Sequence, residues 1–89
     1  MTKKRRKLNK DFEKKIYSSK KNVELVLAKI YDIDDEEIQK EYMNAFNKVV
    51  FLYDQLKNDY ESIGFNDNSE ILIANYKEAL NLFEAEFEI

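Results

Sequence analysis

The chain has 89 residues, of which 44% are hydrophobic and 37% are charged, and its formal net charge is −3. It contains one glycine, no proline, no cysteine and no histidine. Without cysteine and histidine it lacks a thiol nucleophile, the usual general base and the commonest metal ligands. This composition favours a single small all-α domain and argues against most enzyme mechanisms. We therefore expect no enzymatic activity, no cofactor and no metal site.

Two features of the chain bear on where the protein acts. No apolar run approaches the roughly 20 residues that a membrane helix needs. The basic N-terminus is not followed by the apolar stretch of a signal peptide, so we expect a cytoplasmic protein with no membrane partner. Lys, Asn, Ile, Tyr and Phe together make up 42 of the 89 residues. This bias is typical of AT-rich coding sequences, as in low-GC bacteria and their phages or plasmids.

Positive charge is concentrated at the N-terminus. Residues 1–22 carry ten Lys and Arg and two acidic residues, a net charge of +8, whereas residues 23–89 carry a net charge of −11. Residues 1–8 include the sequence KKRRK and are expected to form a flexible basic arm. Lysine and arginine at phosphates release counterions, so this arm favours binding to nucleic acid without sequence preference. The candidate nucleic-acid-binding residues are Lys3, Lys4, Arg5, Arg6, Lys7, Lys10, Lys14 and Lys21.

The pattern predicts a first helix over about residues 9–31. Asn9 is a typical N-cap residue, and Asp11 and Glu13 suit the positive end of the helix dipole. In helical form the last four candidate lysines, from Lys7 to Lys21, would share one face. Ser18 and Ser19 could instead divide the segment into two helices, although we favour one. Its apolar row consists of Phe12, Ile16, Ser19, Val23, Val26 and Ile30, with Ser19 as the only polar member.

The longest predicted helix covers about residues 35–63 and contains neither glycine nor proline. Two adjoining apolar rows make its apolar arc too wide for one buried face, so we expect neighbours on more than one side. Phe51 falls outside both rows. The first row is Ile38, Tyr42, Ala45, Val49, Leu52, Leu56, Tyr60 and Ile63, and the second is Met43, Phe46, Val50 and Tyr53.

The expected helix ends carry cap patterns. Two pairs, Asp34 with Glu37 and Asp67 with Glu70, have the D-x-x-E spacing of a capping box. Gly64 is expected to end the central helix in a left-handed conformation, because glycine adopts positive φ without strain. The residue behind it would then fold back on the helix, as in a Schellman motif.

A third helix is predicted over about residues 68–88, with an apolar row of Ile73, Tyr76, Leu80, Phe83 and Phe87. Short loops make sequential helices antiparallel neighbours. The sequence therefore predicts one helical domain over residues 9–89. Its expected fold is an up-down-up three-helix bundle with a long central helix.

The function predicted first is that of a small nucleic-acid-binding regulator or accessory factor of a phage or mobile element. The basic arm could instead bind an acidic protein or serve as a solubilising tail. The alternative function is a protein-binding inhibitor of a nucleic-acid-handling enzyme, such as an anti-defence or anti-CRISPR-like protein. Apolar surface left uncovered on the central helix would allow a homodimer. The alternative would use acidic residues that imitate phosphates, namely Asp54, Asp59, Glu61, Glu84, Glu86 and Glu88.

Overall fold

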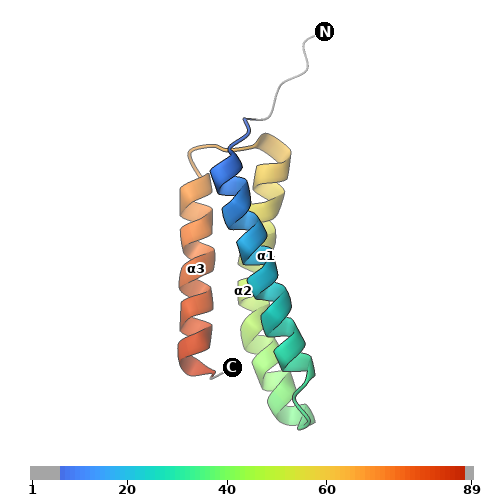
Figure 1. Cartoon of the computed structure of the whole chain (residues 1–89). Coiled ribbons are helices and arrows are strands. Elements are labelled where there is room, and N and C mark those ends of the chain that lie inside the picture. The colour runs from blue at the N-terminus through green and yellow to red at the C-terminus, as the bar shows by residue number, and fades with distance from the viewer. Residues whose placement is uncertain (1–6, 88–89) are drawn as a thin grey trace.

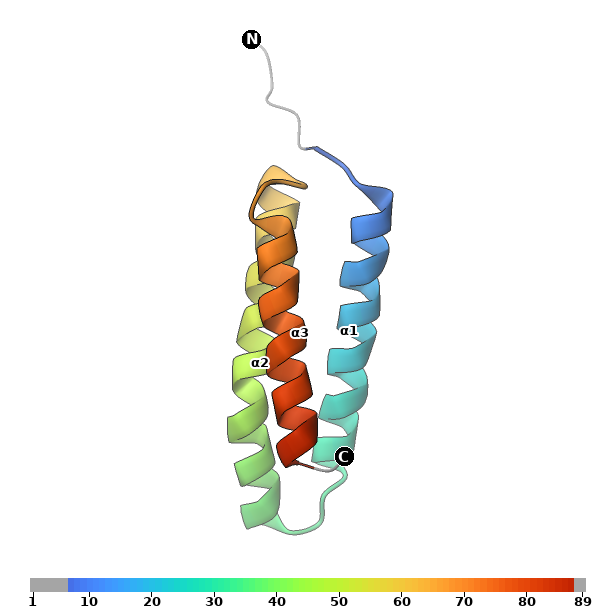
Figure 2. The same ribbon diagram turned by 90° about the vertical axis from the view of Figure 1, so that its left-hand side faces the viewer.

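The computed structural model describes residues 7–87, and these form three α-helices and no strand. The helices are α1 (Lys10–Tyr31), α2 (Glu36–Ile63) and α3 (Ser69–Glu86), so the predicted all-α class is confirmed. They lie side by side, with α1 and α3 running in one direction and α2 in the other (Figure 1). At a rise of 1.5 Å per residue, α2 is about 42 Å long and α3 about 27 Å. The loop between α1 and α2 therefore lies beyond the end of α3 (Figure 2).

One continuous helix, α1, spans the two serines, as predicted. The N-cap is also confirmed, since the Asn9 side chain accepts a hydrogen bond from the Phe12 N–H at 3.0 Å. Ser19 is buried in the apolar row, where its hydroxyl donates to the Lys15 carbonyl at 2.8 Å. The carbonyl of Ser19 accepts a hydrogen bond from the Tyr76 hydroxyl of α3 at 3.2 Å. Burial raises the pKa of Tyr76 above its ordinary value, because desolvation disfavours the charged phenolate.

The buried row of α2 draws on both apolar rows predicted for this helix. Because α1 and α3 cover the helix from two sides, the members of each row that lie nearest to the other row are the ones that become fully buried. Leu52 is half-buried, while Ile38 and Ile63, near the two ends, are exposed. Phe51, which falls outside both rows, is also exposed. The buried residues of α2 are Phe46, Val49, Tyr53, Leu56 and Tyr60.

The buried side chains form two clusters along the bundle. The smaller one lies at the end of the bundle that carries the α2–α3 loop, and it holds Phe12, Leu56, Tyr60 and Ile73. The larger one fills the remaining length, and contains Val23, Val26, Ile30, Phe46, Val49, Tyr53, Tyr76, Leu80 and Phe83.

The prediction of Asp34 as the N-cap of the central helix is wrong. The N-cap is Asp35, whose side chain accepts from the N–H groups of Glu37 and Ile38 at 2.9 and 3.2 Å. Because Asp35 directly precedes the first helical residue, its carboxylate reaches the free N–H groups of the first turn.

The capping box predicted from Asp67 and Glu70 is also wrong. Helix α3 begins at Ser69, and its N-cap residue Asn68 makes no side-chain cap hydrogen bond. Asn66 orders the turn instead: its side-chain oxygen accepts from the Asn68 N–H at 2.8 Å, and its own N–H donates to the Ser69 hydroxyl at 2.9 Å.

Gly64 ends α2 with φ 76° and ψ −161°, so the predicted positive φ is confirmed. This combination lies in a region that only glycine enters readily, not in the left-handed helical region. The predicted Schellman motif is therefore wrong. The Phe65 N–H donates instead to the carbonyl of Lys7 at 2.7 Å, and the Phe65 ring meets Phe12 edge to face at 5.2 Å. The α2–α3 loop is thus joined to the segment that precedes α1.

Candidate nucleic-acid interface

Three of the candidate lysines, Lys10, Lys14 and Lys21, lie on the outer face of α1. At 3.6 residues per turn they fall within about 40° of one another, on the side of α1 opposite its buried row. All three side chains are exposed. The predicted common face therefore holds for these three residues. The other predicted residues Lys3, Lys4, Arg5 and Arg6 lie outside the described residues.

Lys7 does not share that helical face, which corrects the prediction. Asn9 caps the helix and α1 begins at Lys10, so Lys7 is not helical. Its carbonyl accepts from Phe65, and its Nζ lies 5.8 Å from the centre of the Phe65 ring, within the range of a cation–π interaction. This contact places a cation beside the α2–α3 loop.

The net charge of α1 is opposite in sign to the net charges of α2 and α3. Helix α1 has six lysines and three acidic residues, α2 has three lysines and six acidic residues, and α3 has one lysine and four acidic residues. The net charges are therefore +3, −3 and −3. Among the helices of the described part of the chain only α1 has a net positive charge, so it is the helix that attracts phosphates.

An exposed aromatic residue, Tyr17, lies on the basic face and was not among the predicted site residues. Its side chain is 58% exposed, and the Nζ of Lys21 lies 5.3 Å from the centre of its ring. Exposed aromatic rings beside cations are the surfaces on which unpaired bases stack. The signal was present in the sequence, because Tyr17 lies three residues after Lys14 and four before Lys21.

Carboxylates border the basic face on the side of α2. A shallow hollow between the two helices is lined by Tyr17 and Lys20 of α1 and by Tyr53 and Glu61 of α2, among others. Burial, followed by the negative charges of Asp54, Glu24 and Glu61, raises the pKa of Tyr53 above its ordinary value. The hollow is lined by two lysines and two glutamates, so its charges balance, whereas Lys10, Lys14 and Lys21 on the outer face of α1 are all cations.

The acidic residues considered as phosphate mimics do not gather on one face. Glu61 lines a hollow between α1 and α2, and Glu84 lines a groove between α1 and α3. Glu86 lines a third groove, between α2 and α3. The predicted acidic surface is therefore divided among the three sides of the bundle, and Glu88 lies outside the described residues.

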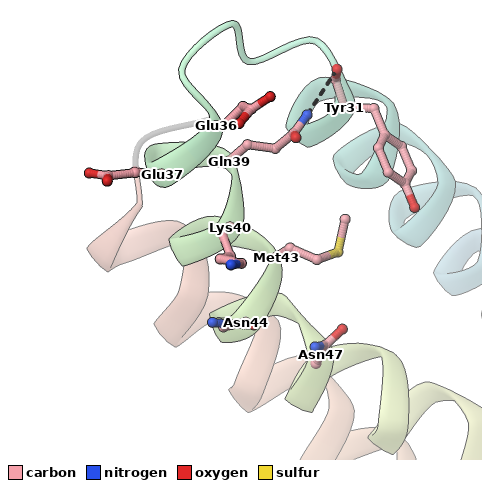
Figure 3. Close-up of a pocket in the computed structure, with 8 residues that line it drawn as sticks. All are labelled: Tyr31, Glu36, Glu37, Gln39, Lys40, Met43, Asn44 and Asn47. Atoms are coloured by element: carbon pink, nitrogen blue, oxygen red, sulfur yellow. Dashed lines mark hydrogen bonds between the residues drawn. The ribbon is translucent and has the colours of Figure 1, made fainter.

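A hollow of about 680 Å³ lies between the end of α1 and the start of α2 (Figure 3). Gln39 points from α2 toward α1, where its amide donates to the carbonyls of Ile30 and Tyr31 at 3.1 and 3.2 Å. The amide therefore holds the end of α1. The hollow is lined by Tyr31, Glu36, Glu37, Gln39, Lys40, Met43, Asn44 and Asn47, and this lining offers no nucleophile paired with a base.

Residues 7–87 contain no group of three or more acidic side chains arranged to hold a metal ion. Over the same residues, no helix has the length and apolar character required to cross a bilayer. The features that remain for function are the basic outer face of α1 and the uncovered surfaces of α2 and α3.

Comparison with known proteins found no relative: no protein-family model, no curated protein and no solved structure matches the chain.

Proposed function

We propose that this protein is a small, non-enzymatic, cytoplasmic protein that binds nucleic acid through its basic N-terminal arm and the outer face of α1. It would act as a regulator or accessory factor of a phage or mobile element. The observation that carries the proposal is the common exposed face of Lys10, Lys14 and Lys21 on the one helix with a net positive charge. Lysines spaced along a helix face can each meet a backbone phosphate.

Salt dependence of binding tests this proposal. The affinity for labelled duplex DNA, single-stranded DNA and RNA is measured by fluorescence anisotropy from low to near-physiological salt. The logarithm of the affinity should fall linearly with the logarithm of salt concentration, with a slope of about 0.9 per phosphate contact on duplex DNA. Absence of binding at low salt to all three would refute the proposal.

Two sets of variants locate the phosphate-binding residues. Changing Lys10, Lys14 and Lys21 together to Ala should weaken binding and reduce the salt slope by about 0.9 for each phosphate that is no longer neutralised. Changing Lys3, Lys4, Arg5, Arg6 and Lys7 together to Ala tests the arm in the same way.

The matched control changes three lysines of the acidic helices, Lys40, Lys48 and Lys77, to Ala. These side chains are also exposed, and the control variant has the same net charge as the triple variant of α1. Equal losses from the two triple variants would show a response to net charge alone and would refute an interface on α1.

The second candidate function is inhibition of a nucleic-acid-handling enzyme through the acidic helices. The net charge of −3 on each of α2 and α3 favours it. An inhibitor of this kind would bind neither DNA nor RNA, and would bind and inhibit such an enzyme through residues of α2 or α3. If substitution of the acidic residues of α2 and α3 left binding to the enzyme unchanged, this second function would be excluded.

A further inference from the structure

Of the three grooves between pairs of helices, one is turned away from the basic helix. On one flank of α2, Glu61 lines a hollow with Glu13 of α1, and on one flank of α3, Glu84 lines a groove with Lys29 of α1. The opposite flanks of α2 and α3 form the third groove without any residue of α1. It is lined by Ala45, Lys48, Val49, Ala79, Leu82, Phe83, Glu86 and Phe87, and we call this side the α2–α3 face.

Apolar residues recur along the α2–α3 face. On α2, Ile38, Ala45 and Leu52 follow one another at seven-residue steps, which keeps them on the same side of the helix. On α3, Ile71 and Leu82 are eleven residues apart, which is three turns. Ile71 and Leu82 are 58% and 62% exposed. The seam between α2 and α3 thus offers the kind of surface on which a further helix packs in a bundle.

Carboxylates flank the apolar residues of this face. Glu41 lies one turn from Ala45, and both Glu78 and Glu86 lie one turn from Leu82. All three carboxylates are exposed. Lys48 is the cation among the residues that line the groove. A helix that packs here must therefore present apolar side chains toward the seam and cations toward the rim.

The charges at the rim select between two occupants. In a two-fold dimer, a second copy of the chain would present the same patch, so three glutamates and one lysine, Lys48, of each copy would face the same set on the other, with a net negative charge on both sides. Like charges at an interface disfavour such a pair. The basic arm of the chain itself, residues 1–8, has apolar side chains only at its two ends, Met1 and Leu8, so it has no apolar row to fill the seam. A separate protein with a basic amphipathic helix satisfies both requirements.

We propose that the α2–α3 face binds a positively charged amphipathic helix of a partner protein. This surface is separate from the nucleic-acid interface on α1, so either proposal can fail alone. A partner bound here would leave the outer face of α1 open, which would allow the protein to hold a partner and a nucleic acid at the same time.

The test uses a synthetic helical peptide of three heptads with leucine at positions a and d and lysine and alanine elsewhere. Isothermal titration gives its affinity, and amide chemical shifts in NMR spectra locate its site. We expect shifts on the α2–α3 face and at least tenfold weaker binding of a peptide with the same composition in scrambled order. Equal binding of the two peptides, shifts confined to other faces, or no binding would overturn the proposal.

A matched pair of variants sharpens the test. Leu82→Lys places a cation in the seam and should reduce the peptide affinity at least tenfold, because it removes apolar surface and repels the peptide. Leu25→Lys is the control, since Leu25 of α1 is 61% exposed, close to the 62% of Leu82, but lies outside the α2–α3 face. Equal effects of the two variants would overturn the proposal.

Further measurements separate the proposed complex from unfolding and from self-association. Circular dichroism shows whether each variant keeps its helices, and a Glu78→Gln, Glu86→Gln double variant reduces the negative charge of the face while leaving its apolar residues unchanged. That double variant should weaken binding several-fold at low salt and less at high salt. Sedimentation of the protein alone should show a monomer. A dimer that Leu82→Lys dissociates would assign the face to a second copy instead.

Discussion

At the end of the bundle that carries the α2–α3 loop, directional hydrogen bonds join two segments that are distant in sequence, residues 7–13 and residues 60–65, whereas at the other end aromatic rings join α2 to α3. At the first end, the Phe65 N–H donates to the Lys7 carbonyl, the Asn9 N–H donates to the Tyr60 hydroxyl at 3.0 Å, and that hydroxyl donates to Glu13. At the other end, ring centres lie 4.8 Å apart for Tyr42 and Phe87 and 4.9 Å apart for Phe46 and Phe83.

The two kinds of contact constrain the chain differently. Packed aromatic rings stabilise the fold mainly through the area that they bury, and this packing tolerates small rotations of the rings. Hydrogen bonds weaken steeply when their geometry changes, so they fix a segment in one position. The polar contacts hold the residues just before α1, and this is where the proposed basic arm joins the bundle. Stability and the placement of the arm should therefore respond to different substitutions.

The largest expected loss of stability comes from the aromatic end. Phe46 is fully buried at 0% exposure, so Phe46→Ala removes a whole ring and leaves a cavity. We expect it to lower the free energy of unfolding by about 3–5 kcal/mol, measured by urea denaturation followed by circular dichroism. If the variant does not fold, Phe46→Leu should give a smaller loss that is measurable.

Leu52→Ala is the matched comparison on the same helix. Leu52 is only half-buried, so truncating its side chain removes less buried area and should cost less than Phe46→Ala. A greater loss from Leu52→Ala would mean that the helix presents a different row to the core.

The next largest effect is expected at the polar end, from Gly64→Val. A β-branched residue cannot reach φ 76° and ψ −161° without strain, and we expect a loss of about 1–3 kcal/mol in the same unfolding measurement. Ser62→Val is the control, because Ser62 is an exposed helical residue two positions away and valine costs little there. Equal losses would show that the effect belongs to valine and not to the backbone conformation of Gly64.

The sequence predicted well those features that depend on local periodicity. The rows of α1 and α3 were recognisable because a helix repeats its faces every 3.6 residues, whatever lies beside it. In α2 the sequence showed a wide apolar arc but not which part of it is buried. That depends on where α1 and α3 lie, which is why Leu52 is half-buried and Phe46 fully buried. Adjacent Asp34 and Asp35 gave two possible caps one residue apart, and spacing alone could not choose between them.

Contacts between segments that are distant in sequence could not be predicted from the periodicity of the apolar residues. The hydrogen bond from Phe65 to Lys7 joins residues 58 positions apart, and Lys7 lies before the Asn9 N-cap, so it does not share the helical face that the lysine spacing predicted. The common face of Lys10, Lys14 and Lys21 was predictable because all three lie in one helix. The separation of the acidic residues onto three sides was not, because it depends on how the helices pack.

A smaller effect is expected from Tyr60→Phe, which keeps the ring of the polar end and removes its hydroxyl. The Asn9 N–H and the Glu13 carboxylate each lose a hydrogen-bond partner, so the free energy of unfolding should fall by about 1–2 kcal/mol. The amide of Asn9 should also exchange its proton with solvent faster, as measured by NMR. Tyr31→Phe is the control at a ring that is 67% exposed, and should leave both quantities nearly unchanged.

The smallest effect should come from Gln39→Ala, which tests the polar contact at the otherwise aromatic end. The amide of Gln39 donates to the carbonyl of Tyr31 (Figure 3) and to that of Ile30, which also accepts from the Ile33 N–H at 3.1 Å. Water can replace the amide at Tyr31, which is exposed, so the loss should be only about 0.5–1 kcal/mol. Gln55→Ala, an exposed glutamine on the same helix, controls for the change in helix propensity. If Gln39→Ala costs more than Tyr60→Phe, then both ends of the bundle depend on directional hydrogen bonds, and the contrast between them is wrong.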